Sequence, residues 1–209
     1  MIIVITAPRA TPGEVAACNA LFEQGLQVLH LRKPGAPREE YEAFIRRRLP
    51  AYRRRIVVHD HFELVEHHGL KGIHANAQQA AGLTGDFAHV SLSCHSPGEI
   101  EATDALPFVP AYLFLSPVFD SISKPGYAAA AFDERRLRAA LAGRRVIALG
   151  GVTAANLPAC RRAGYAGGAL LGHLWEKPAE AVERFSRLPL PPALSIAGFD
   201  PTSGAGVSS

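Results

Sequence analysis

Short apolar segments alternate with helix-like segments along almost the whole chain, and this alternation limits the fold more than any other feature. Each apolar segment is bounded by turn residues, as expected for a strand that is buried on both faces. Eight such segments occur, at residues 2–6, 27–33, 55–60, 72–76, 89–95, 112–119, 145–151 and 167–172. A helix-like pattern follows seven of them. Because helical connections between successive strands make those strands parallel, the sequence predicts a parallel α/β sheet.

Two parallel architectures fit this rhythm, a closed (β/α)8 TIM barrel and an open doubly wound sheet. Eight units of about 22 to 25 residues match the barrel. An open sheet normally has a glycine-rich loop after its first strand, whereas the first loop here reads TAPRATPG. We therefore predict the barrel. Its helices should include one ended by Gly69, one capped by Ser96, and one capped by Thr153 that Pro158 weakens.

The barrel is expected to fill residues 1–188 as one domain. The chain has 209 residues, 48% of them hydrophobic and 20% charged, which suits a single globular core. No apolar run is long enough to cross a membrane and no signal-type pattern starts the chain, so we expect a cytoplasmic location. The basic cluster at 46–55 lacks a surrounding aromatic stacking platform. We therefore expect a small-molecule partner, and neither nucleic acid nor a membrane.

Polar residues gather where the predicted strands end, while the strand interiors are apolar. In a TIM barrel the carboxyl ends of the strands form the mouth that carries the chemistry. We therefore predict a ligand site there. The polar residues at these ends are His30, Arg32, Lys33, His59, Asp60, His61, His74, Asn76, Ser93, His95 and Ser116, followed by the glycine pair Gly150 and Gly151.

Glycines after the last two strands predict a site for a phosphate group. Glycine lets backbone amides approach a ligand closely, and the loops after strands seven and eight recurrently bind phosphate in this architecture. The relevant segments are LGG at 149–151 and ALLGH at 169–173. The long loop at 116–127 adds a cation, Lys124, which suits a second anionic group.

Metal and proton-transfer chemistry both have candidates at the mouth. His59 and His61 flank Asp60 in a pattern that resembles paired metal ligands, but further carboxylates at strand ends are missing. Asp60 fits better as a single ligand to a hydrated magnesium ion, which is the one cofactor we consider. His95 is the strongest acid–base candidate, because imidazole titrates near neutral pH.

Together these motifs resemble the family of thiamine phosphate synthases and the related thiazole tautomerases. The resemblance covers residues 2 to about 186 and consists of seven motifs in the expected order. LHLRK resembles the family's Gln-Leu-Arg-Glu-Lys, and VVHDHFEL resembles Ile-Asn-Asp-Arg-x-Asp-Leu. The other motifs are GLKGIHA, SLSCHS, LSPVFDSISKPG, ALGGVTAANL and GYAGGALLGHLW.

If the chain resembles the synthases in activity, the resemblance implies that it couples a pyrimidine pyrophosphate to a thiazole phosphate and releases pyrophosphate. Carried over to this chain, Arg32 and Lys124 would hold pyrophosphate, Lys124 at the reacting centre, and Asp60 would hold magnesium. Ser121 and Ser123 stand where the family has threonines. The thiazole phosphate would be bound by backbone amides of Gly150, Gly151, Leu171 and Gly172. A homodimer is a further expectation that rests on the family alone.

The chain departs from the family pattern on the magnesium and pyrophosphate side. His30 replaces a glutamine, Lys33 a glutamate and His59 an asparagine, and Gln79 stands where a second magnesium carboxylate is expected. These changes favour the tautomerase branch, in which a histidine on the fifth strand moves a proton without a metal. His95 is the match. Synthase activity, an inert phosphate-binding barrel and a metal-dependent hydrolase remain alternatives.

The last residues, 189–209, change in character. LPLPP reads as a linker, and ALSIAGFDPTSGAGVSS resembles the opening strand and loop of hydroxymethylpyrimidine phosphate kinase. A kinase needs a whole further domain, so we predict a disordered tail without kinase activity.

Overall fold

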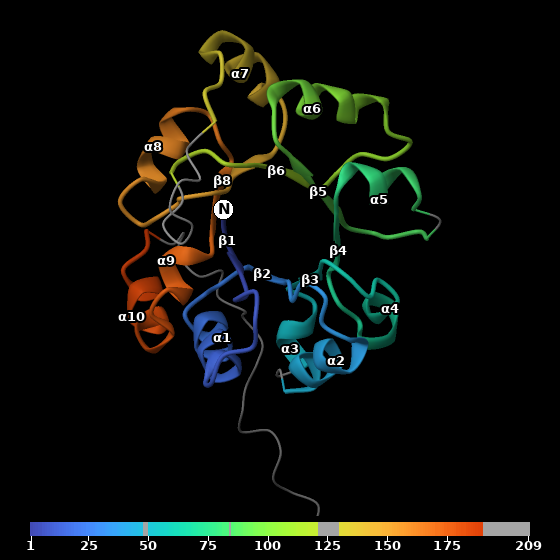
Figure 1. Ribbon diagram of the computed structural model, residues 1–209, viewed down its shortest axis with the longest axis vertical. Helices are drawn as coiled ribbons and strands as arrows, with labels where there is room; N and C mark the ends of the chain where they lie inside the picture. The colour runs from blue at the N-terminus through green and yellow to red at the C-terminus, as the bar shows by residue number, and fades with distance from the viewer. Residues whose placement is uncertain (48–49, 84, 121–129, 190–209) are drawn as a thin grey trace, which may run out of the picture.

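The protein is a closed barrel of eight parallel strands, which confirms the predicted fold (Figure 1). The computed structural model describes residues 1–47, 50–83, 85–120 and 130–189. Each strand pairs with the next in sequence, and β8 pairs with β1 to close the ring. The strands are β1 (Ile2–Ile5), β2 (Val28–Leu31), β3 (Ile56–Val58), β4 (Gly72–Ala75), β5 (Val90–Cys94), β6 (Tyr112–Leu115), β7 (Val146–Ala148) and β8 (Gly167–Leu170).

The strands bury both faces because successive side chains point to opposite sides of the sheet. On β1, Ile2 and Val4 join the layer between the strands and the helices, whereas Ile3 and Ile5 point into the barrel. Tyr112 and Phe114 of β6 fill the same interior. This double burial explains why the strand sequences are almost continuously apolar.

Helices surround the barrel on its outside (Figure 1). No helix among the described residues has both the length and the hydrophobicity of a membrane-spanning segment. The α-helices are α1 (Glu14–Glu23), α2 (Arg38–Arg46), α3 (Pro50–Arg53), α4 (Leu64–His68), α5 (Ala77–Ala81), α6 (Pro97–Ala102), α7 (Glu134–Leu141), α8 (Leu157–Arg162), α9 (Gly172–Trp175) and α10 (Ala181–Ser186), with 3-10 turns η1 (Thr103–Ala105) and η2 (Pro178–Glu180).

Two of the three predicted helix signals are confirmed and one is wrong. Gly69 ends α4 in a left-handed conformation, and the Ser96 hydroxyl accepts a hydrogen bond from the Glu99 amide at the start of α6. Thr153 does not cap α8, because Asn156 is the N-cap residue. Thr153 and Asn156 instead exchange side-chain hydrogen bonds across the preceding turn. Pro158 therefore lies in the first turn, where a missing N–H costs little.

A glycine at the start of β4 is required by close packing between strands. A Cβ atom at Gly72 would lie 2.0 Å from the carbonyl oxygen of His89, which accepts the β4 hydrogen bond of Ile73. We expect Gly72→Ala to lower the free energy of unfolding by about 1–3 kcal/mol, as overpacking does elsewhere. Urea denaturation followed by circular dichroism would measure this.

Gly82 provides the matched control. A Cβ atom there would make only ordinary contacts of 3.7 and 3.9 Å. Gly82→Ala should change the stability by less than about 0.5 kcal/mol. Equal losses in the two variants would contradict the packing argument.

Candidate functional site at the barrel mouth

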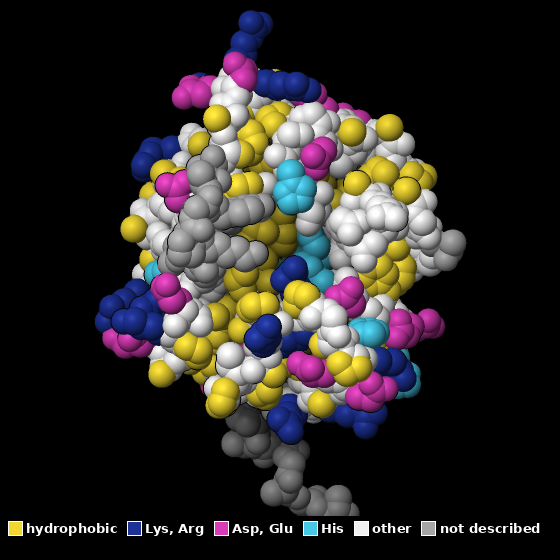
Figure 2. Space-filling view, in the orientation of Figure 1, with side chains coloured by type: hydrophobic (Ala, Val, Ile, Leu, Met, Phe, Trp, Pro, Cys, Tyr) yellow, Lys and Arg dark blue, Asp and Glu magenta, His cyan; other side chains and the backbone are white. Residues whose placement is uncertain are grey.

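The carboxyl ends of the strands enclose a cavity of about 370 Å³. Figure 2 shows histidine side chains beside hydrophobic ones in a hollow at the centre of this face. The cavity brings together most of the residues predicted from sequence, from strands on opposite sides of the ring. Those that line it are Arg32, His59, His74, Ser93, His95, Ser116, Gly150, Gly151, Leu171 and Gly172.

The glycine pair after β7 forms one wall of this cavity. Gly150 and Gly151 have φ angles of 89° and 62°, a region that favours glycine. A Cβ atom at Gly151 would lie 2.2 Å from the backbone oxygen of Asp120. The Asn156 side-chain amide donates to the Gly151 carbonyl over 2.9 Å and fixes this loop. The glycine pair therefore contributes backbone rather than side chains to this wall, and backbone N–H groups in loops of this kind can bind anions.

His95 stands at the end of β5 with its ring oriented by the protein. The Nδ1 atom lies 3.0 Å from the carbonyl oxygen of Ser116. Because a carbonyl can only accept, Nδ1 must carry the proton, and in the neutral ring Nε2 then holds the free lone pair. The backbone amide of His95 donates to the Glu99 carboxylate over 2.9 Å. An exposed imidazole held in this tautomer is suited to act as a base.

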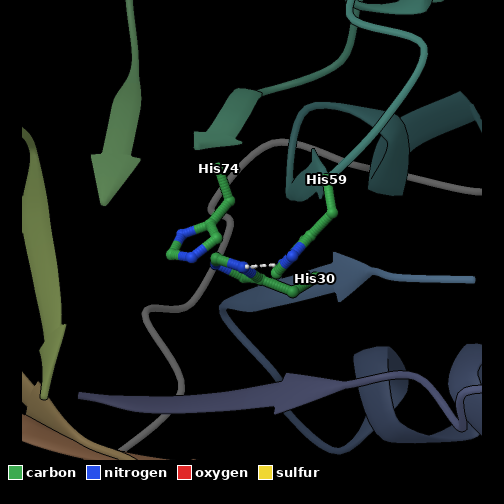
Figure 3. Close-up of side chains that lie close together, drawn as sticks. All are labelled: His30, His59 and His74. Carbon is green, nitrogen blue, oxygen red and sulfur yellow. Dashed lines mark hydrogen bonds between the residues drawn. The ribbon is translucent and has the colours of Figure 1, made fainter. Parts of the chain in front are cut away.

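Three other histidines converge inside the barrel, and we call them the histidine cluster (Figure 3). His30 comes from β2, His74 from β4, and His59 directly follows β3. His30 Nδ1 lies 2.9 Å from His59 Nε2, and the rings of His59 and His74 are 4.4 Å apart between centroids. Figure 3 shows the hydrogen bond between His30 and His59.

Tyr112 and Ser91, which were not predicted from sequence, hold this cluster together with the predicted Ser93. His30 Nε2 is 2.5 Å from the Tyr112 hydroxyl, and His74 contacts Ser91 and Ser93 through its two ring nitrogens over 2.9 and 2.7 Å. Ser91 and Tyr112 are polar groups at inward-facing positions of apolar strands. Such positions could have marked these residues in the sequence.

Burial keeps the histidine cluster neutral. Removal from water lowers the pKa of His30 and His59 well below 6.5. The pKa of His30 is lowered further because its protonation would be repelled by any positive charge on His59 or His74, and His74 and Arg32 act in the same way on His59. Burial, followed by the Arg32 charge, lowers the pKa of His74 to about 3. At neutral pH the main cavity is therefore lined by the positively charged Arg32 and by the uncharged imidazoles of His59 and His74.

The acidic side of the mouth contains Asp60 in an adjoining cavity of about 340 Å³. The Tyr41 hydroxyl donates to the Asp60 carboxylate over 3.0 Å, and burial raises the pKa of Tyr41, so the phenol remains a donor. Gln79 also lines this cavity, but its side-chain oxygen accepts a hydrogen bond from the backbone N–H of Asn76 in the capping box of α5. Asp60 is the one carboxylate among the described lining residues.

Lys33 does not reach either cavity at the mouth. Its ammonium group is buried and donates to Glu14 over 2.6 Å and to the Ala7 carbonyl over 2.7 Å. Glu14 also accepts from the Ala7 amide. The structure thus places this predicted substrate contact in an ion pair between the end of β2 and helix α1.

His61 also points elsewhere, because its Nε2 contacts the Ala36 carbonyl over 3.0 Å. It does not join His59 in a shared ligand set. Lys124, Ser121 and Ser123 lie outside the residues that the structure describes, as does the tail from residue 190. Their predicted roles stay predictions.

Comparison with known proteins identifies the family. The model of the thiamine monophosphate synthase family matches residues 2–174. The chain belongs to this family. Its members are enzymes of thiamine biosynthesis, and membership implies phosphorylated small molecules as substrates. The resemblance seen in the sequence motifs is therefore confirmed.

Solved structures of thiamine monophosphate synthase family proteins agree with this assignment. Thiamine phosphate pyrophosphorylase from Bacteroides thetaiotaomicron is 34% identical with a TM-score of 0.75, over 89% of this chain and 94% of that protein. The Pyrococcus furiosus thiamine phosphate pyrophosphorylase is 20% identical with a TM-score of 0.67, over 90% and 92% of the two chains, and supports the fold. A search of curated protein sequences found no match.

The histidine cluster predicts that stability falls in mild acid. Below pH 6.5 the unfolded chain binds protons on histidines that stay neutral in the folded protein, so protons favour unfolding. Each such histidine contributes up to about 1.4 kcal/mol per pH unit between its unfolded and folded pKa values. We expect His30→Gln/His59→Asn to show a shallower loss of stability from pH 7 to 5, measured by urea denaturation with EDTA present. Parallel pH profiles would show that the cluster is not the cause.

The Lys33–Glu14 ion pair predicts a structural role. Lys33→Met should lower the stability by about 3–5 kcal/mol, because Glu14 is left as an uncompensated buried charge. Lys33→Met/Glu14→Leu should recover a large part of that loss in a double-mutant cycle. If Lys33→Met kept its stability but lost affinity for a phosphorylated ligand, Lys33 would belong to the binding site after all.

Proposed function

We propose that this protein moves a proton on a thiazole carboxylate phosphate, as a thiazole tautomerase, with His95 as the acid–base group. The observation that carries the proposal is the orientation of His95. Its Nδ1 proton is committed to the Ser116 carbonyl, which leaves Nε2 to take a proton from a ligand carbon and return it to another position. The wall formed by Gly150 and Gly151 lines the same cavity and suits the phosphate.

The other cavity groups support binding rather than proton transfer. Leu171 and Gly172 extend the glycine wall after β8, and Ser93 offers a hydroxyl 2.7 Å from His74 Nε2. Arg32 is the cation of the described cavity and suits the carboxylate of the ligand. His59 and His74 add neutral polar contacts at the floor.

The donor groups near Asp60 fit magnesium poorly. Magnesium prefers several hard oxygen ligands with negative charge. Here the Asp60 carboxylate already accepts from Tyr41, and Gln79 supplies an uncharged oxygen that is engaged at Asn76. We therefore route no step through magnesium. A proton transfer at His95 requires none.

Synthase activity is the second candidate, and one observation favours it. The protein from Bacteroides thetaiotaomicron that is 34% identical is a thiamine phosphate pyrophosphorylase. For this chain to act likewise, Asp60 would have to supply the protein's part of a magnesium site, with Arg32 and Lys124 at the pyrophosphate.

Replacement of His95 tests the proposed proton transfer. His95→Asn should lower the rate by about 10²–10⁴-fold, the usual contribution of a general acid–base group. The phosphate site is intact in this variant, so the affinity for thiazole phosphate should not change. Hydrogen–deuterium exchange into the substrate, followed by NMR, measures the rate, and calorimetry measures the affinity. His67→Asn, at an exposed position of α4, is the matched control.

Three outcomes decide between the candidates. Exchange that depends on His95 supports the tautomerase. Binding without exchange supports an inert phosphate-binding barrel. Formation of thiamine phosphate from the pyrimidine pyrophosphate and thiazole phosphate, dependent on magnesium and at an ordinary enzymatic rate, would establish the synthase instead.

Gln79→Glu tests whether the missing second carboxylate limits magnesium binding in the Asp60 cavity. A glutamate can retain the capping box of α5 and would add a second carboxylate to the Asp60 cavity. If Gln79 is what limits magnesium binding, this variant should bind magnesium more tightly than the wild type by calorimetry. No gain in affinity would show that the limit lies elsewhere in this cavity.

A further inference from the structure

We infer that the histidine cluster is a binding site for a divalent transition-metal ion, of the class that includes zinc and cobalt(II). His30, His59 and His74 each offer a ring nitrogen, and these nitrogens all lie within 4.8 Å of one another. Imidazole nitrogen suits zinc, copper and nickel ions rather than magnesium. Asp60 is not one of these ligands, although it lines the adjoining cavity together with His59 and His74. The proton transfer proposed above does not require the ion.

One nitrogen–nitrogen distance is close to that of a zinc site, and the His74 nitrogen lies within 4.8 Å of the other two. Zinc–nitrogen bonds of about 2.0–2.1 Å place tetrahedral ligand nitrogens about 3.3 Å apart. His30 Nδ1 and His59 Nε2 are 2.9 Å apart, so small side-chain shifts would admit an ion between them. The nitrogens now share a proton, and the ion would replace it.

The surrounding hydrogen bonds orient the rings as ligands. The Ser91 hydroxyl donates to the Ile73 carbonyl over 3.3 Å, so its oxygen can accept from Nδ1–H of His74. His74 Nε2 then accepts from the Ser93 hydroxyl over 2.7 Å, and a bound ion would replace that hydrogen bond. His30 Nε2–H can donate to the Tyr112 oxygen while its Nδ1 faces His59. Metal-binding histidines commonly donate their second N–H to such a partner.

The cluster is held by the barrel and open on one side. His30 on β2 and His74 on β4 lie on either side of β3, and both are buried in the barrel interior. His59 and His74 also line the main cavity. Three protein nitrogens leave a fourth coordination position. That position would face the cavity, where a water molecule or an anionic oxygen of a ligand could occupy it.

The only other such group in the described ranges lacks these properties. Glu42, His67 and His68 lie near the surface, and the Glu42 carboxylate is paired with Arg38 and Arg46. His67 and His68 are adjacent on a helix of five residues. This group provides a control for non-specific binding.

The positions where this sequence differs from its family suggest a variant that removes metal ligands with little change to the fold. His30 and His59 stand where the family motifs have glutamine and asparagine, so His30→Gln/His59→Asn restores the residues that this fold accepts elsewhere. It removes two ligands and keeps hydrogen-bonding side chains. Thermal unfolding in EDTA would verify that the variant is folded.

The experiment titrates metal ions into the full chain, expressed without a histidine tag and stripped with a chelator. We expect one equivalent of Zn²⁺ by calorimetry, and one equivalent of Co²⁺ with the visible absorption of a four-coordinate site. His30→Gln/His59→Asn and His59→Asn alone should each weaken binding at least about 100-fold, since even loss of a second-shell partner costs 10–100-fold. His67→Gln/His68→Gln should bind as the wild type does.

Two results would contradict the metal site at the histidine cluster. Wild-type protein that binds neither ion, or binding that survives His30→Gln/His59→Asn and is lost in His67→Gln/His68→Gln, would overturn the inference. No substrate is present in this titration, so its result does not depend on whether the protein is a tautomerase or a synthase.

Discussion

Closure of the sheet by the pairing of β8 with β1 is the constraint on which the rest of the molecule depends. Once the ring is closed, every strand has an inner face that must be filled by side chains, and every strand ends at the same mouth. Residues as distant in sequence as Arg32, His95 and Gly150 therefore line one cavity. The site is a consequence of topology before it is a consequence of any single residue.

The interior departs from the usual aliphatic filling on one side. Ile3, Ile5 and Ile147 fill part of the barrel, whereas His30 and His74 occupy inward positions on β2 and β4. Buried polar groups are tolerated when they are hydrogen-bonded. Here Tyr112, Ser91 and Ser93 supply the partners, so the polar interior continues without interruption into the cavity above it.

The sequence predicted the fold well because eight buried strand segments recur and a helix-like pattern follows seven of them. A local error such as the expected Thr153 cap does not change this overall pattern. It also predicted that the carboxyl ends of the strands, with their polar residues, meet at one mouth. It could not predict where long side chains go after leaving a strand. Lys33 was expected at the ligand, but its stem is long enough to reach Glu14 on α1. The histidine cluster was missed as a unit because its members meet only across neighbouring strands.

The contact between His95 and the Ser116 carbonyl has an evolutionary consequence. The group that selects the protonated nitrogen is a main-chain atom, which no point mutation can delete. Ligand preference could therefore drift through changes in the cavity side chains while the imidazole keeps its orientation. Inheritance of that orientation is tied to the path of the polypeptide after β6, so related barrels could diversify their cavities around an imidazole that stays in place.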